Sequence, residues 1–102
     1  MTIEFSNKHL LELYKKGQSK KYKLPEEIID KYFMRIQQLE TAEDINYFRK
    51  LPKLKFEKLK GTKNRFSIRL DKKWRLEFNI DFENEDETVG TIFIKELSKH
   101  YE

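Results

Sequence analysis

The stretch of sequence that decides the fold is Lys53–Arg75, which reads KLKFEKLKGTKNRFSIRLDKKWR. It is dense in Lys and Arg, is interrupted by a single glycine, Gly61, and becomes a strict alternation of polar and apolar residues toward its end. From Arg49 to Arg75 there are twelve Lys or Arg and two acids, so the local charge is +10 against +4 for the whole chain. We interpret the stretch as a basic surface built on β-structure, which the rest of the chain supports.

Two alternating runs predict a β-hairpin. Phe66, Ile68 and Leu70 alternate with polar residues, and the alternation resumes after Lys72–Lys73 and continues from Trp74 to Phe82. Alternating runs joined by a short polar turn form hairpins with one apolar and one polar face. We expect the apolar face to meet the helices. The predicted polar face carries Ser67, Arg69, Arg75, Glu77 and Asn79.

Further strands are predicted on either side of the hairpin. Leu54 and Phe56 alternate with Lys55 and Glu57, which predicts a strand running into Gly61. The near-continuous apolar run over residues 89–97 suits a central strand of the sheet. At the N-terminus, the pattern over residues 3–5 fits either a short strand or an anchoring arm, and both interpretations remain open.

Three helices are predicted before the basic stretch. The first begins near Lys8, behind a capping Ser6 or Asn7, and ends near Gly17. The second begins with Pro25 at its first helical position, and we expect it to lie across the sheet as half of the core. Its apolar stripe is Leu24, Ile28, Ile29, Tyr32, Phe33, Ile36 and Leu39. The third covers residues 43–50 and ends before Pro52, with Ile45, Tyr47 and Phe48 as its apolar side chains.

Length and composition indicate one folded domain over residues 1–102. Charged residues make up 39% of the chain, which raises the question of disorder. Aromatic residues at 14% and the clear apolar periodicity argue against disorder, because disordered segments are poor in both. We therefore expect Phe, Tyr and Trp to supply much of the buried area.

Several classes of site and location are disfavoured. The chain has no cysteine, so disulfides and Cys-based zinc sites are excluded, and two histidines far apart in sequence do not suggest a metal site. We expect no metal and no cofactor. No apolar run approaches the roughly 18 residues of a membrane span, and the N-terminus lacks the pattern of a signal peptide. The expected location is the cytoplasm.

Charge is segregated along the sequence. Residues 1–48 are neutral, residues 49–75 carry +10, and residues 76–96 carry −6. This segregation favours a basic face for an anionic partner and a separate acidic face. The alternative is that neighbouring strands neutralise each other through cross-strand ion pairs. The sequence leaves both open.

The predicted polar face carries residues suited to phosphate chemistry. Arg69 and Arg75 would project from the same face, and a guanidinium can grip two phosphate oxygens. Lys60 precedes Gly61, and His100 and Tyr101 follow the last strand, from which they could fold over that face. Arginine and histidine suffice for metal-free RNA cleavage, because the 2′-hydroxyl of RNA is its own nucleophile. The ordinary alternative is a set of solvated or ion-paired arginines and a frayed tail.

Four segments carry a resemblance to a known family. They are FEKLKG at 56–61, NRFSIRL at 64–70, KWRLEF at 73–78 and ELSKHY at 96–101. Together they resemble the HigB-type toxins of bacterial toxin–antitoxin modules, in the RelE/ParE superfamily. The resemblance covers residues 54–101, whereas the N-terminal helices match in length and pattern only.

The resemblance implies a fold and a function. The fold is α+β, with N-terminal helices packed on a small antiparallel sheet of about four strands. The function is that of a ribosome-dependent, metal-independent endoribonuclease that cleaves mRNA in the ribosomal A site. The implied partners are 16S rRNA, mRNA and a cognate helix-turn-helix antitoxin, with operator DNA bound only through the antitoxin.

The resemblance also assigns roles to residues. Arg75 would sit at the scissile phosphate, Lys60 would neutralise phosphate charge, and His100 and Tyr101 would supply the C-terminal catalytic pair. Which of the two protonates the leaving group stays open, because their order is shifted relative to some members. Some members have His where this chain has Glu57. The residues expected to hold RNA are Lys58, Lys63, Arg65, Arg69, Lys72 and Lys73.

Two other functions remain open on the same fold. One is a ParE-like inhibitor of DNA gyrase that cuts no RNA. The other is a catalytically inactive relative that only binds an antitoxin.

Overall fold

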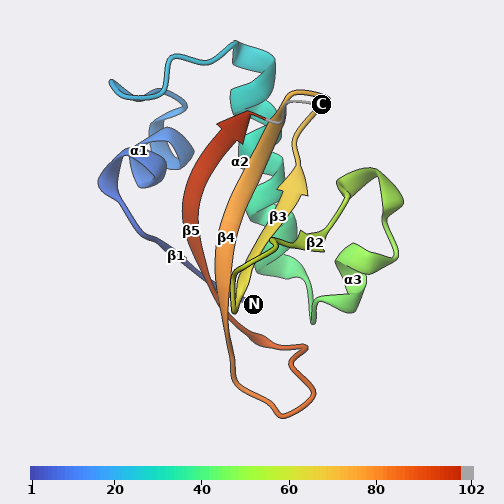
Figure 1. Cartoon of the computed structure of the whole chain (residues 1–102). Coiled ribbons are helices and arrows are strands. Elements are labelled where there is room, and N and C mark those ends of the chain that lie inside the picture. The colour runs from blue at the N-terminus through green and yellow to red at the C-terminus, as the bar shows by residue number, and fades with distance from the viewer. Residues whose placement is uncertain (100–102) are drawn as a thin grey trace.

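The computed structural model describes residues 1–99 and shows one mixed sheet with helices on one face (Figure 1). Within those residues the sheet has five strands, in the order β1-β5-β4-β3-β2. They are β1 (Thr2–Phe5), β2 (Glu57–Lys58), β3 (Arg65–Arg69), β4 (Trp74–Phe82) and β5 (Gly90–Lys99). The α+β class is confirmed. In the same residues, no helix is both long and apolar enough to cross a membrane.

The expectation of an antiparallel sheet of about four strands is wrong in one respect. Strand β1 adds a fifth strand and pairs parallel to β5, with Ile3 opposite Ile92, which makes the sheet mixed. The start of the chain is fixed by its amino group, which donates to the carbonyl oxygens of Glu40 at 2.6 Å and Ala42 at 3.0 Å. These bonds hold Met1 at the end of the long helix, and residues 2–5 lie along the edge of the sheet as a short strand, which was one of the two interpretations left open.

The predicted hairpin is confirmed as strands β3 and β4. Phe66 pairs with Phe78 and Ile68 with Leu76, so the apolar residues share one face. The connecting turn is closed by Asp71, whose carboxylate Oδ1 accepts the backbone N–H groups of Lys73 at 2.8 Å and Trp74 at 2.7 Å. Strand β5 is central, as predicted, because it lies between β1 and β4.

The predicted strand from Leu54 into Gly61 is mostly wrong. Pro52–Leu54 form a short 3-10 helix, η1, which buries Leu54. Lys55 then turns the backbone through a left-handed conformation (φ 49°), and only Glu57–Lys58 pair with β3. The alternation in this segment therefore arises from a tight turn followed by a two-residue edge strand.

The helices begin and end close to the predicted points. Helix α1 (Lys8–Lys16) is capped by Asn7, whose Oδ1 accepts the N–H of Leu10 at 2.9 Å, and it stops at Gly17 in the left-handed region. Helix α2 (Glu26–Thr41) starts one residue after Pro25. Helix α3 (Asn46–Arg49) is shorter than the predicted span of 43–50. It lies beside η1 rather than among the packed N-terminal helices (Figure 1).

The core lies between α1, α2 and the apolar face of the sheet. Tyr32 is fully buried, as predicted, and its hydroxyl donates to the carbonyl of Leu10 at 2.7 Å, which ties α2 to α1. The prediction that Phe33 is a core residue is wrong, because its side chain is 41% exposed. It instead stacks on Tyr14, with ring centroids 4.9 Å apart, at the outer side of the helix pair.

The Tyr32 hydroxyl offers a test of this packing. We expect Tyr32→Phe to lower the free energy of unfolding by about 1–2 kcal/mol, because the carbonyl of Leu10 is left buried without its donor. Tyr47→Phe is the matched control, because Tyr47 is 42% exposed, and it should change stability by less than about 0.5 kcal/mol. Urea unfolding measures both variants. Equal midpoints would show that the buried hydrogen bond contributes nothing.

Candidate nucleic-acid interface

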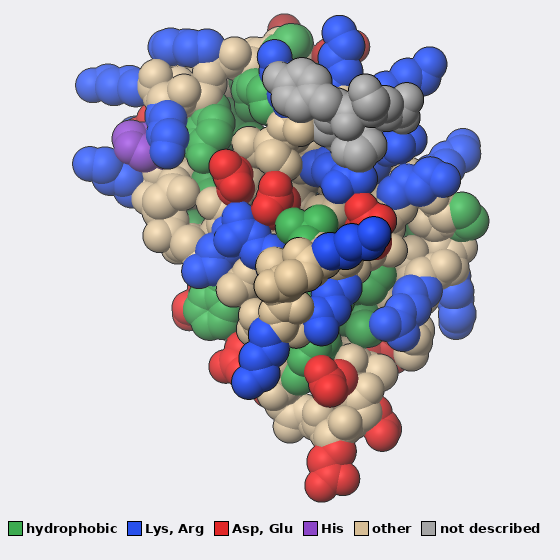
Figure 2. Space-filling view, viewed as in Figure 1, with side chains coloured by type: hydrophobic (Ala, Val, Ile, Leu, Met, Phe, Trp, Pro, Cys, Tyr) green, Lys and Arg blue, Asp and Glu red, His purple; other side chains and the backbone are tan. Residues whose placement is uncertain are grey.

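The face of the sheet away from the helices carries the charged side chains of β3 and β4. Figure 2 shows this face, with Lys and Arg gathered toward its upper part and Asp and Glu at its lower tip. Figure 1 places the β4–β5 loop, which contains the acidic run 83–87, at that tip. The acidic loop and the basic β3–β4 turn therefore lie at opposite ends of β4. The other charges are mixed, because Glu77 and Glu96 pair with Arg65 on the sheet.

Arg75 occupies the middle of the basic end. In the pairing of β4 with its neighbours, Arg75 lies opposite Arg69 of β3 and opposite Ser98 of β5. The prediction that Arg69 and Arg75 share a face with Ser67 agrees with this register, because residues two apart on a strand point the same way. Two like charges directly opposite each other on a sheet repel, so this pair favours an anion nearby.

A carboxylate already occupies one side of Arg75. The Nη2 atom of Arg75 lies 2.9 Å from Oε1 of Glu57 on β2. The Arg75 side chain is 19% exposed and that of Glu57 is 50% exposed, so solvent reaches the pair mainly from the Glu57 side. Ser67, opposite Glu57 in the register, is only 1% exposed and forms part of the floor of the site.

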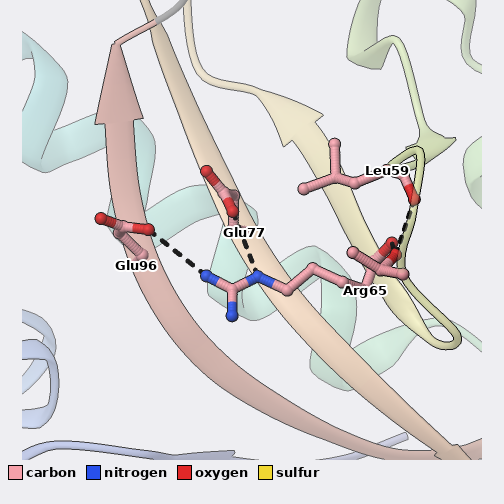
Figure 3. A network of polar contacts seen from close by, with 5 residues as sticks. Leu59, Arg65, Glu77 and Glu96 are labelled. Carbon is pink, nitrogen blue, oxygen red and sulfur yellow. Dashed lines mark hydrogen bonds and ion pairs between the residues drawn. The ribbon is translucent and has the colours of Figure 1, made fainter.

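Arg65 is engaged by two carboxylates (Figure 3). Its Nε lies 3.1 Å from Oε1 of Glu77 on β4, and its Nη2 lies 3.3 Å from Oε2 of Glu96 on β5. The side chain thus reaches across two neighbouring strands, as Figure 3 shows. At this residue the alternative of cross-strand neutralisation describes the structure. The expected role of Arg65 in holding RNA stays a prediction, and RNA would have to compete with both carboxylates.

The structure separates Lys60 from Arg75. Leu59 donates its N–H to the carbonyl of Arg65, so Lys60 lies near the Arg65 end of β3, whereas Arg75 is opposite Arg69. The two ends are four residues apart, or about 13 Å at roughly 3.3 Å per residue. The backbone positions of Lys60 and Arg75 are therefore separated along the sheet, while the Arg75 side chain reaches toward Glu57.

The other predicted RNA-binding lysines divide between two places. Lys58 and Lys63 line a hollow of about 430 Å³ beyond the edge strand, together with Arg49 and Phe56 and close to the acidic β4–β5 loop. Lys72 and Lys73 are exposed in the β3–β4 turn, next to Arg69 and Arg75 along the chain. Lys72 and Lys73 therefore extend the basic end around Arg75, whereas Lys58 and Lys63 lie apart from it.

The predicted pair His100 and Tyr101 lies outside the described residues. The described end of β5 nevertheless bears on the prediction, because Ser98 is opposite Arg75 and Lys99 is opposite Trp74. Lys99 also places its Nζ 5.3 Å from the centroid of the Trp74 ring. The strand that leads to His100 thus ends beside Arg75.

Arg35 on α2 is a residue that the sequence interpretation missed. Its Nε donates to the carbonyl of Arg69 at 3.0 Å, and its Nη1 donates to Gln38 at 3.0 Å. Burial lowers the pKa of the Arg35 guanidinium. The sequence does show that Arg35 is next to Ile36, a buried residue of α2. It does not show that Arg35 contacts Arg69, because that contact joins two elements distant in sequence.

Tyr22, in the loop between α1 and α2, is a second missed residue. Burial raises the pKa of its phenol, and the negative charge of Glu96 raises it further, so Tyr22 remains protonated at neutral pH.

In residues 1–99, no three His, Asp or Glu side chains lie close enough together to hold a metal ion.

The family comparison agrees with this geometry. The model of one family, described as the RelE-like toxin of the type II toxin–antitoxin system HigB, matches residues 3–95. The chain belongs to the HigB-like toxin family. The match includes Glu57, Lys60 and Arg75 and ends before His100. A comparison with curated proteins found no match. As a member of a type II toxin–antitoxin family, this HigB-like toxin is expected to have an antitoxin partner.

The Glu57–Arg75 pair leads to a test of anion binding. An anion that binds Arg75 in this HigB-like toxin has to compete with the negative charge of Glu57, and a partly exposed ion pair of this kind contributes about 0–1 kcal/mol. We expect Glu57→Gln to tighten the binding of inorganic phosphate by roughly two- to fivefold, which corresponds to that range of energy. Titration of the Arg75 side-chain N–H signals by NMR measures the dissociation constant.

Glu83→Gln is the control for this experiment, because it removes the same charge from an exposed position in the β4–β5 loop. It should leave phosphate binding at Arg75 nearly unchanged. Weaker binding in Glu57→Gln would show instead that the carboxylate holds Arg75 in a binding orientation.

Proposed function

We propose that this HigB-like toxin is a ribosome-dependent endoribonuclease that cuts mRNA in the cytoplasm without a metal ion. The observation that carries the proposal is the position of Arg75, which lies opposite Arg69 and beside the end of the strand that leads to His100. A guanidinium fixed next to a second one is suited to a phosphate that gains negative charge during a reaction.

The proposed reaction is an internal transfer at one phosphate of the message. The 2′-oxygen of the preceding ribose attacks phosphorus, a new O2′–P bond forms, and the P–O5′ bond breaks. The 2′-hydroxyl gives its proton to solvent water as it attacks, and the departing 5′-oxygen takes a proton from His100. Arg75 stabilises the negative charge on the five-coordinate phosphorus, and His100 serves as the acid, with Tyr101 stacking on or orienting a base.

The surrounding cations would hold the message and the ribosome. Arg69, Lys72 and Lys73 adjoin Arg75 and would contact neighbouring phosphates. Lys60, which lies about 13 Å further along the sheet, would contact a more distant one. Lys58, Lys63 and Arg65 would bind 16S rRNA or mRNA near the other end of β3, away from Arg75. The proposed antitoxin is a helix-turn-helix protein that also connects the toxin to operator DNA.

Expression of wild type and Arg75→Ala in bacteria tests the proposal. We expect wild type to arrest growth and to produce new mRNA 5′ ends within translated regions. Arg75→Ala should cut at least about 100-fold more slowly, because a group that stabilises transition-state charge typically contributes that much. Primer extension on total RNA measures the cleavage. Arg75→Lys should be intermediate, because it keeps the charge but loses the planar fork.

Lys15→Ala is the control, because it removes one positive charge from an exposed position on α1 and should arrest growth as wild type does. Equal arrest by wild type and Arg75→Ala would overturn the proposal. Arrest with uncut messages and damaged DNA would indicate a gyrase inhibitor. A folded wild type that causes no arrest would indicate a relative that only binds an antitoxin.

A further inference from the structure

A second basic site lies beside the Arg75 face, in a cleft of about 490 Å³ between α2, η1 and the β3–β4 turn. In Figure 1, α2 and the β3–β4 turn lie in the upper part of the molecule, and Lys and Arg side chains gather in the upper part of the face shown in Figure 2. The cations that line the cleft are Lys31, Arg35, Lys53, Lys55, Arg69 and Lys72. Four of them, on α2, η1 and the residue after it, have no role in the function proposed above.

Positive charge exceeds negative charge among the described residues that line the cleft. Asp71 is the one acid among the lining residues described, and its carboxylate is engaged in the turn, where it accepts the N–H groups of Lys73 and Trp74. None of the ion pairs in the described part of the chain includes a cation of the cleft. This contrasts with Arg65 and Arg75, each of which has a carboxylate partner.

Two residues of the cleft are held in orientations that favour a ligand. Arg35 is fixed by its donations to the carbonyl of Arg69 and to Gln38, and these leave its Nη2 group for another acceptor. Lys55 adopts a left-handed backbone conformation (φ 49°), which residues with a Cβ rarely adopt. This conformation caps the C-terminus of η1, where the N–H of Lys55 donates to the carbonyl of Pro52, and so fixes the backbone of Lys55 at the edge of the cleft.

The cleft adjoins the Arg75 face at Arg69, which lines the cleft, accepts the Nε–H of Arg35 at its backbone carbonyl and lies opposite Arg75 in the sheet. We propose that the cleft binds the sugar–phosphate backbone of the RNA strand beyond the bond that is cut, with Lys31, Arg35, Lys53 and Lys55 as its contacts. This inference rests on the function proposed above, since it extends the path of the same RNA.

The chemistry of the lining distinguishes RNA from other anions. Six cations from several segments exceed the charge of one free phosphate, whereas a chain of phosphodiesters supplies one negative charge at every nucleotide. A protein partner would need an apolar or aromatic centre to its interface. The apolar members of the lining are Pro52 and Leu70, and Leu70 is buried, so the cleft offers little such surface.

Salt-dependent RNA binding tests the inference. The probe is a fluorescently labelled 12-nucleotide single strand with 2′-O-methyl groups, which cannot be cut because the nucleophile is blocked. Each phosphate contact adds about 0.7 to the slope of log affinity against log salt concentration. We expect Lys31→Ala/Lys53→Ala/Lys55→Ala to lower that slope by about 2 and the affinity at low salt by roughly tenfold. Fluorescence anisotropy measures both quantities.

The matched control is Lys8→Ala/Lys15→Ala/Lys16→Ala, which removes the same charge from exposed positions on α1. It should leave the slope within about 0.5 of wild type. Equal slopes for the two triple variants would show that only net charge matters and would overturn the inference. Stronger displacement of the RNA by poly-glutamate than by unlabelled RNA of equal charge would also overturn it, in favour of an acidic protein partner.

A second variant keeps the test valid if the triple variant does not fold. Lys55→Gly removes one charge and places glycine where the backbone is left-handed, so it should fold at least as well as wild type and lower the slope by about 0.7.

The proposed nuclease function and the proposed RNA-binding cleft can be overturned separately. Equal growth arrest by wild type and Arg75→Ala overturns the nuclease but leaves a slope difference intact. Normal mRNA cutting with unchanged slopes overturns only the cleft.

Discussion

The register of β4 against its two neighbours is the constraint on which the rest of the structure depends. A shift of one residue in either pairing would turn the apolar side chains to solvent and Arg75 into the core, because side chains alternate between faces. The register is fixed by the packing of Leu76 and Phe78 against the core and by the Asp71 turn that starts β4. The same register places Arg69 and Ser98 on either side of Arg75.

The Lys and Arg side chains of the basic surface repel one another, and the fold has to offset this repulsion. On the sheet, carboxylates from other strands offset it. Glu57 pairs with Arg75, and Glu77 and Glu96 both pair with Arg65. These pairs are partly exposed, so each contributes little and can be exchanged for a phosphate at small cost. In the cleft beside α2 the described residues offer no such partner. The molecule therefore combines exchangeable ion pairs on the sheet with uncompensated cations next to it.

The parts of the fold that follow a local period could be predicted from the sequence. The hairpin, the helix caps at Asn7 and Gly17, and the buried Tyr32 all follow from patterns within a few residues. The parts that depend on distant contacts could not. The parallel position of β1 depends on β5 and on the end of α2, and the 3-10 turn at Leu54 depends on the left-handed backbone at Lys55. Phe33 fits the helical stripe, but its side chain lies at the outer side of α2, where it stacks on Tyr14 and stays exposed to solvent.

The candidate site divides in the same way. Alternation is enough to place Arg69 and Arg75 on one face, because both belong to the hairpin. It could not show that Glu57 pairs with Arg75, that Lys60 lies well away from it, or that Arg35 reaches Arg69 from a helix, since each depends on how separate elements meet.

The separation of charge along the molecule has a consequence for how RNA would approach it. Under the proposed function, the negative phosphate backbone is attracted to the end that carries Arg69, Arg75 and the cleft, and it is repelled by the acidic β4–β5 loop at the opposite tip. Long-range charge would thus orient the toxin before any specific contact forms. The Arg75 face and the cleft adjoin each other at the attracted end, so one orientation presents both to the same strand. The acidic loop would then contribute to binding by disfavouring the reversed orientation rather than by touching RNA.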